Sequence, residues 1–401
     1  MKLSSLGRSR GAHRYVAAGV AAVAVAGVVL GGVATAASAA ADPTAWAAPS
    51  RIVLQVGADE SQRVVNWYSN NADKDQVVQV APSYQVWNGQ FPPSALTFAS
   101  VVTKNNAVTN PATKNSKELY NGHAVITGLK QYTQYVYRVG EAGHWSASYT
   151  FKTQAFGGNY DFLFFGDPQI GSSGDDVLDG TGWSATLDTA LAANPNAELL
   201  VSGGDQVENA NDETEWDQFF ASDKLRQYPW VSTIGNHDVG GAAYNQHFWE
   251  PNNTNGTADA AKYYANGTPT SDTSGGDYWF IYKGVLFIDL NSNSYATSTG
   301  GGGDAAHIDY VTSVINAQGA KAKYTVLIYH HSIYSPADHA NDDDNAQRRL
   351  DFTTAFSQLG INLVLQGHDH SYSRSYEIKN GYLASDTKEL KGSAWTSQYS
   401  D

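Results

Sequence analysis

The chain has 401 residues, of which only 16% are charged and 38 are glycine, and its formal net charge is −14. This length suits two folded units with a leader and loops, and the composition favours β-rich domains over a helical bundle. A chain this acidic lacks the basic stripe of a nucleic-acid binder, which argues against a role as a nucleic-acid scaffold. Because there is no cysteine, disulfides and thiolate ligands are excluded, and any metal must be held by oxygen and nitrogen atoms.

The N-terminus predicts a secretory signal peptide over residues 1–39. Four basic residues accompany an Ala-, Val- and Gly-rich run over residues 15–33, and small residues at 34–36 and 37–39 offer cleavage sites. An uncleaved membrane anchor is the alternative, since a run of about 19 apolar residues could just span a bilayer. We expect a secreted, extracellular protein with no stable membrane insertion after cleavage. Association with the cell surface is a further expectation.

Residues 46–154 are predicted to form an all-β sandwich of short strands. Hydrophobicity alternates with a period of two, as at 134–140, where Tyr135, Tyr137 and Val139 share one face. The motifs Thr-Gly-Leu, Tyr-x-Tyr-Arg-Val-Gly and Phe-Lys-Thr in this stretch resemble a fibronectin type III module, specifically the N-terminal module of purple acid phosphatases. This domain carries no catalytic constellation, so we expect it to pack against or orient the next one.

After a short joint at 155–159, apolar runs alternate with helix-compatible segments. Strands are predicted at 161–165, 198–202 and 228–234, and helices at 183–193 and 214–225. Such alternation is typical of an α/β domain whose sheet core is flanked by helices, and we assign it to residues 159–401.

Further along this domain, Lys283-Gly284 predicts a hairpin between two β-rich runs. Residues 292–304 and 337–345 are predicted to be loops, and the acidic run at 342–344 is interpreted as part of a solvated loop rather than a calcium site. Only 31 residues follow His370, and the last of them are polar and weakly patterned. We therefore expect a C-terminus that is truncated or disordered.

Five polar turns follow mainly apolar runs. Alone, any one of them is more typical of a turn that satisfies its own backbone than of a metal site. Together they predict convergence, because ligands bind where strands of an α/β sheet end and a preceding glycine allows a sharp turn. The five turns are Gly166-Asp167-Pro168-Gln169, Gly204-Asp205-Gln206-Val207-Glu208-Asn209, Gly235-Asn236-His237-Asp238, His330-His331 and Gly367-His368-Asp369-His370.

Carboxylate, amide and imidazole groups in this number suffice for two metal ions. Mixed His and carboxylate ligation suits Fe, Mn or Zn, divalent or trivalent, better than Ca or Mg. Two metals about 3.5–4 Å apart polarise a phosphoryl oxygen and activate a water, which predicts phosphate ester hydrolysis. In this order the motifs resemble the calcineurin-like metallophosphoesterases, and with the first domain they resemble purple acid phosphatases, over roughly residues 51–376.

The resemblance implies a role for each matching residue. It implies that Asp205 bridges two metals, that Asp167, Gln169 and His370 complete the first site, and that Asn236, His330 and His368 complete the second. His237 would hold the substrate phosphate and protonate the leaving group, Asp238 would orient the His237 imidazole, and His339 would contact substrate. His331 is interpreted as structural, and a solvated loop histidine is the alternative for His339.

Two residues depart from the family pattern. Glu208 stands where purple enzymes place a tyrosinate ligand, so we expect a colourless or weakly coloured protein. Gln169 stands where most relatives have histidine, and a neutral amide is the weaker ligand. The sequence leaves open whether Glu208 assists Gln169 at the metal.

These features predict a secreted binuclear phosphatase that hydrolyses phosphate monoesters of small molecules by attack of a metal-bound hydroxide. A phosphodiesterase or nucleotide hydrolase on the same centre is the first alternative. A surface-binding module with a vestigial metal site is the second.

Overall fold

The computed structural model describes residues 48–71, 75–105, 120–239, 242–253, 277–294 and 305–383. The predicted signal peptide, most of the loop at 292–304 and the last residues of the chain lie outside these ranges. Among the described helices, each falls short of the length and apolar character that a membrane span requires.

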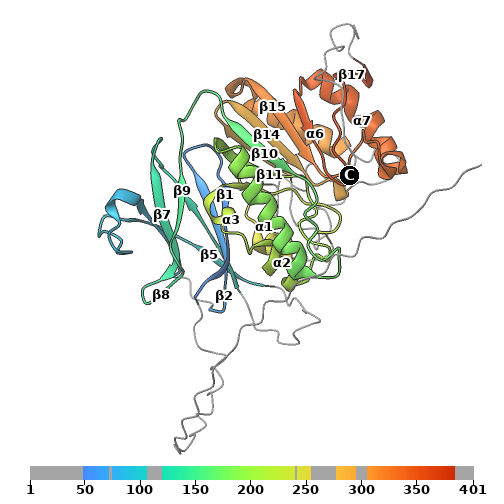
Figure 1. The fold of residues 1–401 in the computed structure, drawn as a ribbon. Coiled ribbons are helices and arrows are strands. Elements are labelled where there is room, and N and C mark those ends of the chain that lie inside the picture. Colours follow the sequence, from blue (N-terminus) through green and yellow to red (C-terminus); the bar gives the residue numbers. More distant parts are fainter. Residues whose placement is uncertain are drawn as a thin grey trace, which may run out of the picture. The chain divides into compact units, whose positions relative to one another are not determined.

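The first part of the chain is β-rich, as predicted (Figure 1). Its alternating sequence places one face of most of these strands in a shared core that includes Leu54, Trp67, Val80 and Tyr137. The strands are β1 (Ser50–Val56), β2 (Arg63–Ser69), β3 (Val77–Pro82), β4 (Leu96–Ala99), β5 (Val101–Lys104), β6 (Tyr120–Ile126), β7 (Gln134–Glu141), β8 (His144–Trp145) and β9 (Tyr149–Lys152), with a 3₁₀ turn η1 (Ser83–Gln85).

The second part is an α/β domain, which confirms the predicted fold class. Its strands are β10 (Asp161–Phe165), β11 (Ala197–Ser202), β12 (Trp230–Val231), β13 (Tyr278–Tyr282), β14 (Val285–Leu290), β15 (Tyr324–Tyr329), β16 (Leu363–Leu365), β17 (Ile378–Lys379) and β18 (Tyr382–Leu383). Its helices are α1 (Asp176–Ala193), α2 (Glu213–Phe219), α3 (Lys224–Gln227), α4 (Ala243–His247), α6 (Ala305–Gln318) and α7 (Asp343–Leu359), with 3₁₀ turns η2 (Ser292–Ser294), η3 (Gly319–Lys321) and η4 (Asp338–Asn341).

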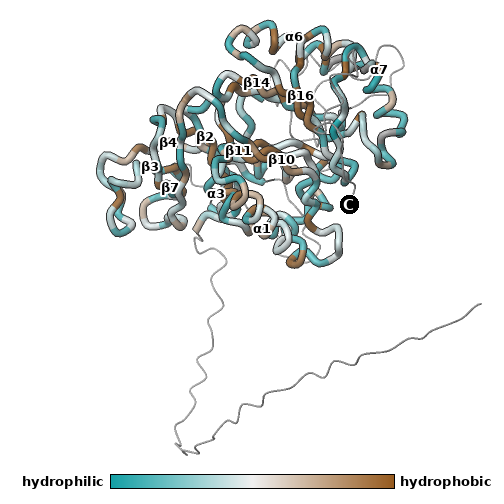
Figure 2. The backbone as a smooth tube through the Cα atoms, turned by 45° about the horizontal axis from the view of Figure 1, so that its top comes forward, coloured by the Kyte–Doolittle hydropathy of each residue, from teal (hydrophilic) through white to brown (hydrophobic). Residues whose placement is uncertain are grey.

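Two sheets form the centre of this domain. Strands β10, β11 and β12 are parallel neighbours in one sheet, and β13, β14, β15 and β16 follow in that order in the other. One apolar cluster, with Leu199, Val201, Phe287 and Ile328, joins the two sheets. Two further clusters pack α1 and α2 on the outside of the first sheet and α6 and α7 on the outside of the second. The order of layers is therefore helix, sheet, sheet, helix, with hydrophobic strands such as β10 and β11 inside (Figure 2).

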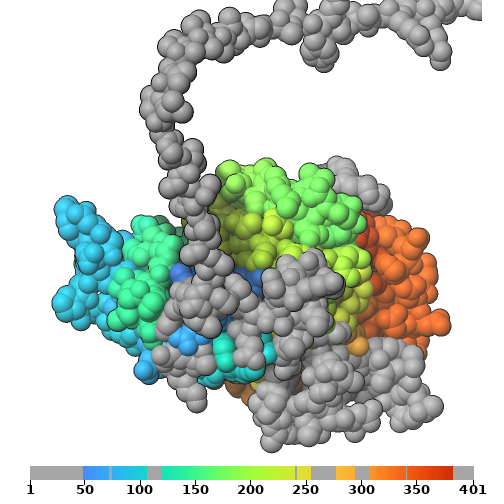
Figure 3. All heavy atoms as spheres, turned by 90° about the horizontal axis from the view of Figure 1, so that it is seen from below, coloured from blue at the N-terminus to red at the C-terminus, as the bar shows by residue number. Residues whose placement is uncertain are grey.

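The first sheet continues into the β-rich part. Its strand order is β10-β11-β12-β1-β2-β6-β5, and Gln55 of β1 pairs in parallel with Trp230 of β12. The Gln55 side chain also accepts a hydrogen bond of 2.9 Å from the backbone N–H of Trp249. One face of the molecule shows the same neighbourhood, with residues of the α/β domain in green and yellow beside the blue β-rich part (Figure 3). The first sheet thus contains strands from both sides of the predicted joint at 155–159.

The hairpin at Lys283-Gly284 is confirmed. Strands β13 and β14 are antiparallel, with Tyr282 opposite Val285, so two residues make the turn. Both have positive φ angles, +48° for Lys283 and +76° for Gly284. This is the conformation that matches the twist of a two-residue hairpin.

Three local predictions were wrong. The run at 228–234 forms only the two-residue strand β12, because residues 232–235 continue as irregular chain towards the polar turn. The helix predicted at 214–225 is divided into α2 and α3. The acidic run at 342–344 is not loop throughout, because Asp343 and Asp344 form the first turn of α7, where carboxylates interact favourably with the helix dipole.

Candidate functional site

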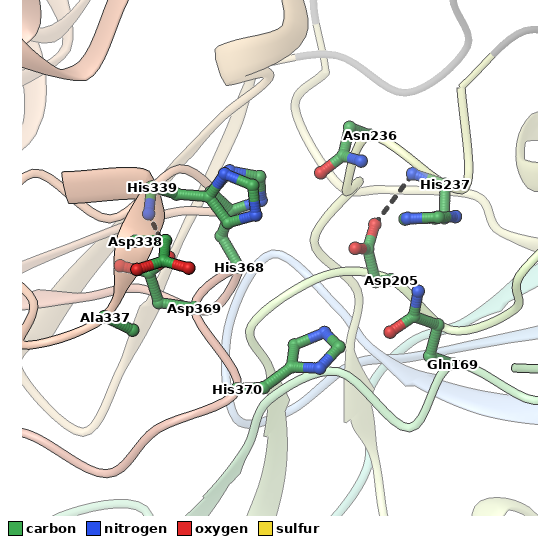
Figure 4. Close-up of a pocket in the computed structure, with 10 residues that line it drawn as sticks. All are labelled: Gln169, Asp205, Asn236, His237, Ala337, Asp338, His339, His368, Asp369 and His370. Atoms are coloured by element: carbon green, nitrogen blue, oxygen red, sulfur yellow. Dashed lines mark hydrogen bonds between the residues drawn. The ribbon is translucent and has the colours of Figure 1, made fainter. Parts of the chain in front are cut away.

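The five polar turns come together at the carboxyl ends of β10, β11, β12, β15 and β16. Four of these turns, together with the segment of η4, line a pocket of about 350 Å³, and His330 and His331 lie behind its wall. Figure 4 shows the side chains arranged around this space. The lining residues are Gln169, Asp205, Asn236, His237, Ala337, Asp338, His339, His368, Asp369 and His370.

His330 lies at the buried end of the cluster and contacts three of the turns. Its Nδ1 donates to the carbonyl oxygen of Gly203 at 2.7 Å, which fixes the ring. Its Nε2 lies 3.2 Å from Asp205 Oδ2 and 2.9 Å from Asn236 Oδ1. One nitrogen, of His330, and two oxygens, of Asp205 and Asn236, therefore lie close together. A fourth predicted ligand, Asp167, is farther away, with its Oδ1 3.9 Å from His330 Nδ1.

The charges of this group are unbalanced without a cation. Burial would lower the pKa of His330, but the Asp205 and Asp167 carboxylates raise it to about 9. Burial raises the pKa of Asp167, whereas for Asp205 the same burial is outweighed by His330 and the pKa falls. A proton on His330 thus offsets only part of the charge of the two carboxylates, and a bound metal would offset more of it in its place.

Two further observations fit a metal. Ligand atoms of Asp205, His330 and His368 all lie within 4.8 Å of one another. Gln169 Oε1 is buried and has no hydrogen-bond partner, which is costly unless something else satisfies it. The residues present therefore fit the metal centre that the sequence predicts.

The backbone at the site is held in an unusual conformation. Five predicted ligands have positive φ angles, a region that residues with a Cβ rarely adopt and that persists when the surroundings enforce it. They are Asp167 (+48°), Gln169 (+40°), Asp205 (+50°), His368 (+78°) and His370 (+46°). Gly235 is required for another reason, because a Cβ there would overlap the Asp205 carboxylate.

The His237 imidazole lies at the pocket wall, and neither of its ring nitrogens is engaged by a predicted ligand. Its Nδ1 lies 2.9 Å from the backbone oxygen of Glu208, and since a carbonyl can only accept, Nδ1 donates. Nε2 is then the nitrogen available to a substrate. The backbone N–H of His237 also donates to Asp205 Oδ1 at 2.8 Å, so the turn is tied to the bridging candidate.

The predicted contact between Asp238 and the His237 imidazole is wrong. Asp238 is completely buried, and its carboxylate accepts from Gln206 N at 2.8 Å, Gln206 Nε2 at 3.0 Å and Gly235 N at 2.8 Å. These donors satisfy it within the turn. Asp238 therefore holds the shape of the loop that carries Asn236 and His237, and the backbone of Glu208 orients the imidazole instead.

His339 lies across the pocket, with its ring centroid 4.3 Å from that of His368. Its Nδ1 is 2.9 Å from Asp342 Oδ2, and this hydrogen bond raises the pKa of the half-exposed His339. The pKa of His368 is lowered to about 4 by burial and by the neighbouring His330 and His339. His339, Asp342 and His368 also form a second group with metal-ligand spacing.

The remaining predicted residues occupy the rim and the back wall. His370 is exposed, and its Nε2 lies 4.0 Å from Asp167 Oδ1. His331 is buried behind His368, with Nδ1 2.7 Å from Ser292 Oγ, in agreement with a structural role.

Sequence reasoning missed three acidic residues at this site. Asp338 and Asp369 line the pocket, and Asp342 contacts His339. Asp369 stands between two predicted ligands, and Asp342 follows His339 by three residues. Both positions could have identified these residues from the sequence.

Comparisons with known proteins agree with this geometry. Residues 49–153 match the N-terminal domain of purple acid phosphatases, and residues 160–372 match the calcineurin-like phosphoesterase family. The chain is 27% identical over 414 residues to an uncharacterized protein of Mycobacterium tuberculosis, covering 94% of this chain and 73% of the relative. It is 22% identical over 356 residues to purple acid phosphatase 1 of Ipomoea batatas, covering 84% of this chain and 67% of that one.

A solved structure shares the fold. It is the purple acid phosphatase PPD1 from yellow lupin (Lupinus luteus) seeds, which aligns with a TM-score of 0.60 at 16% identity. The alignment covers 81% of this chain and 59% of the lupin chain, so the chain spans little more than half of that protein. The family match covers more than half of the chain, and with the converging ligands it shows that the chain belongs to the calcineurin-like phosphoesterases, a family of metal-dependent phosphoester hydrolases.

Proposed function

We propose that the protein is a secreted phosphatase with a binuclear metal centre that hydrolyses phosphate monoesters of small molecules. The observation that carries this proposal is the meeting of His330 Nε2 with Asp205 and Asn236 behind a pocket that Gln169, with its unpartnered oxygen, also lines.

The two metal sites are assigned from the turns. Asp205 would bridge them. Asp167, Gln169 and His370 would hold the first metal, and Asn236, His330 and His368 the second. When bound, the metals supply positive charge for the phosphoryl group and lower the pKa of a water.

The pocket explains why such a centre is needed. Asp205, Asp338 and Asp369 line it, and the whole chain carries a net charge of −14. Carboxylates repel a phosphate ester, so without bound cations this pocket repels its substrate.

Protein side chains would complete the reaction. His237 presents Nε2 to the pocket and, once protonated, can donate that proton to the leaving oxygen. His339 faces the same space from η4, where its hydrogen bond to Asp342 raises its pKa and so favours the protonated form near a bound phosphate.

The test is reconstitution of purified, metal-free protein with Mn, Zn or Fe. We expect two metals per chain by mass spectrometry, and hydrolysis of p-nitrophenyl phosphate in preference to bis-p-nitrophenyl phosphate. Asp205→Asn should lose both metal and activity, while Asp188→Asn, the same charge change on the exposed face of α1, should keep both. Full activity in the presence of a chelator would overturn the proposal, and preference for the diester would make the enzyme a phosphodiesterase.

Secretion is tested separately. Expressed with its own leader, the protein should appear in the medium, and its intact mass should show cleavage near residue 39. Retention in the cell with an uncleaved N-terminus would contradict this part of the proposal.

A further inference from the structure

The turns that follow β10 and β11 are hydrogen-bonded to each other along their backbones. Gln169 N donates to the carbonyl oxygen of Asp205 at 2.9 Å, and Glu208 N donates to that of Ile170 at 2.9 Å. Ile170 and Val207 form a parallel bridge between these contacts. The backbone therefore fixes Gln169 and Glu208 as neighbours before their side chains interact.

The side chains of this pair meet in one orientation. Gln169 Nε2 donates to Glu208 Oε2 at 2.8 Å. A glutamine amide has a donor end and an acceptor end, whereas an ionised carboxylate only accepts. Rotating the amide by half a turn would set its oxygen against the carboxylate oxygen, so Glu208 selects the orientation with the nitrogen towards itself.

The same contact decides where the amide oxygen goes. Gln169 Oε1 is buried and has no hydrogen-bond partner. Figure 4 shows this oxygen turned away from His237 and towards the space beside His370. A buried acceptor without a donor is unfavourable, and a cation at that place would satisfy it.

We propose that Glu208 is a positioning residue that holds the Gln169 amide with its oxygen towards the metal centre. This inference rests on the proposed function. Glu208 also contacts His237. The Nδ1 atom of His237 lies 2.9 Å from the backbone oxygen of Glu208 and 3.4 Å from Glu208 Oε2. One residue thus orients a ligand on one side and the proton donor on the other.

A direct ligand role for Glu208 is the competing explanation. Two backgrounds separate the two roles, because a carboxylate at position 169 has an oxygen at both ends and needs no orientation. If Glu208 orients the amide, Glu208→Ala matters only when residue 169 is glutamine. If Glu208 binds the metal itself, the same change costs affinity in both backgrounds.

The experiment is calorimetric titration of metal-free protein with Mn or Zn alone. We expect Glu208→Ala to lower the metal affinity of one of the two sites by roughly 10- to 100-fold, which is typical when a metal ligand loses the hydrogen-bond partner that orients it. Glu208→Gln should recover most of the affinity, because its side-chain oxygen still accepts from Gln169 Nε2. In the Gln169→Glu background, Glu208→Ala should weaken binding less than threefold.

The controls keep this inference distinct from the proposed function. Asp188→Asn should bind both metals like the unchanged protein, and circular dichroism should show that each variant is folded. If the unchanged protein binds no metal, the proposed function fails. If it binds two metals and Glu208→Ala binds them equally well, or loses affinity equally in both backgrounds, the positioning role is overturned while the proposed function stands.

Discussion

Two buried polar clusters in this molecule look alike in composition but differ in what they leave unsatisfied. One is the group around Asp205 and His330. The other, which we call the interdomain cluster, consists of Arg51, Tyr68, Glu213 and His247, where β1 and β2 of the β-rich part meet α2 and α4. Both contain carboxylates, histidine and buried charge.

In the interdomain cluster the carboxylate is fully partnered. The Glu213 carboxylate forms an ion pair with Arg51 Nη1 at 3.1 Å, accepts a hydrogen bond from Tyr68 OH at 3.0 Å and lies 3.1 Å from His247 Nε2. The Tyr68 and His247 rings stack with centroids 4.3 Å apart. At the metal centre, by contrast, two carboxylates share one histidine and an amide oxygen faces no donor.

The comparison teaches that buried charge alone does not mark a reactive site. Nor does a left-handed backbone, because Arg51 has a φ of +48° just as Asp167 does. What distinguishes the metal centre is an excess of acceptor oxygens, and those are the atoms that a cation requires. Changes at the two clusters should therefore separate catalysis from stability.

The largest effect is expected from His237→Ala. Loss of the proton donor should lower kcat for p-nitrophenyl phosphate by roughly 100- to 10,000-fold. Metal content and melting temperature should stay close to those of the unchanged protein, because among the described residues the ring is hydrogen-bonded to Glu208, which is not one of the assigned ligands. Loss of the metals in this variant would show that His237 is a ligand and would break the assignment.

The next effect is expected from Glu213→Ala in the interdomain cluster. It leaves the ring of His247 buried without its carboxylate, while Arg51 keeps its pairing with Asp217, so we expect a loss of about 3 kcal/mol in the free energy of unfolding. Denaturant titration measures this, and kcat per folded molecule should not change. Asp217→Asn is the control, because Asp217 pairs with Arg51 but is half exposed, so it should cost under about 1 kcal/mol.

A third effect concerns acid. Burial lowers the pKa of His123, which stacks on Trp249, to about 4. In the unfolded chain His123 has a pKa of about 6.5 and becomes protonated below that pH, whereas in the folded chain it stays neutral down to about pH 4. The free energy of unfolding therefore decreases as the pH falls from 6.5 towards 4. At about 1.4 kcal/mol per pKa unit, the loss is on the order of 3 kcal/mol.

His123→Phe should remove this part of the acid sensitivity while keeping a ring against Trp249. Unfolding free energies measured at pH 7 and pH 4 should therefore differ less in the variant than in the unchanged protein. An identical pH dependence would show that His123 is not the group responsible. His247, whose pKa is also lowered by burial, should account for part of the remaining loss.

The smallest effect is expected at Arg138 of β7, which belongs to neither cluster. Its guanidinium lies between the rings of Phe91, at 4.5 Å, and Trp145, at 4.1 Å, and it donates to Gln79 Oε1. Arg138→Gln should lower the unfolding free energy by about 1 kcal/mol. A change of several kcal/mol would mean that surface contacts here matter as much as the buried ones.

The sequence predicted the parts of this structure that are local. Gly-led polar turns after apolar runs identified the residues that meet at the pocket, and Lys283-Gly284 identified its hairpin. The division of the helix after Phe219 was missed because apolar periodicity continues across it. The partners of Asp238 were missed because they depend on how the Gln206 amide enters the turn from another strand.

The pairing of β1 with β12 was the feature hardest to predict from the sequence. It joins strands from opposite sides of the predicted joint, and neither strand has a sequence pattern that identifies its partner. It has a practical meaning. A chain cut at residue 159 would leave β12 as an open edge, a template for aggregation, directly before the Asn236 turn. The β-rich part is therefore not an exchangeable module, and any chimera or truncation that is meant to remain active must carry a strand in the place of β1.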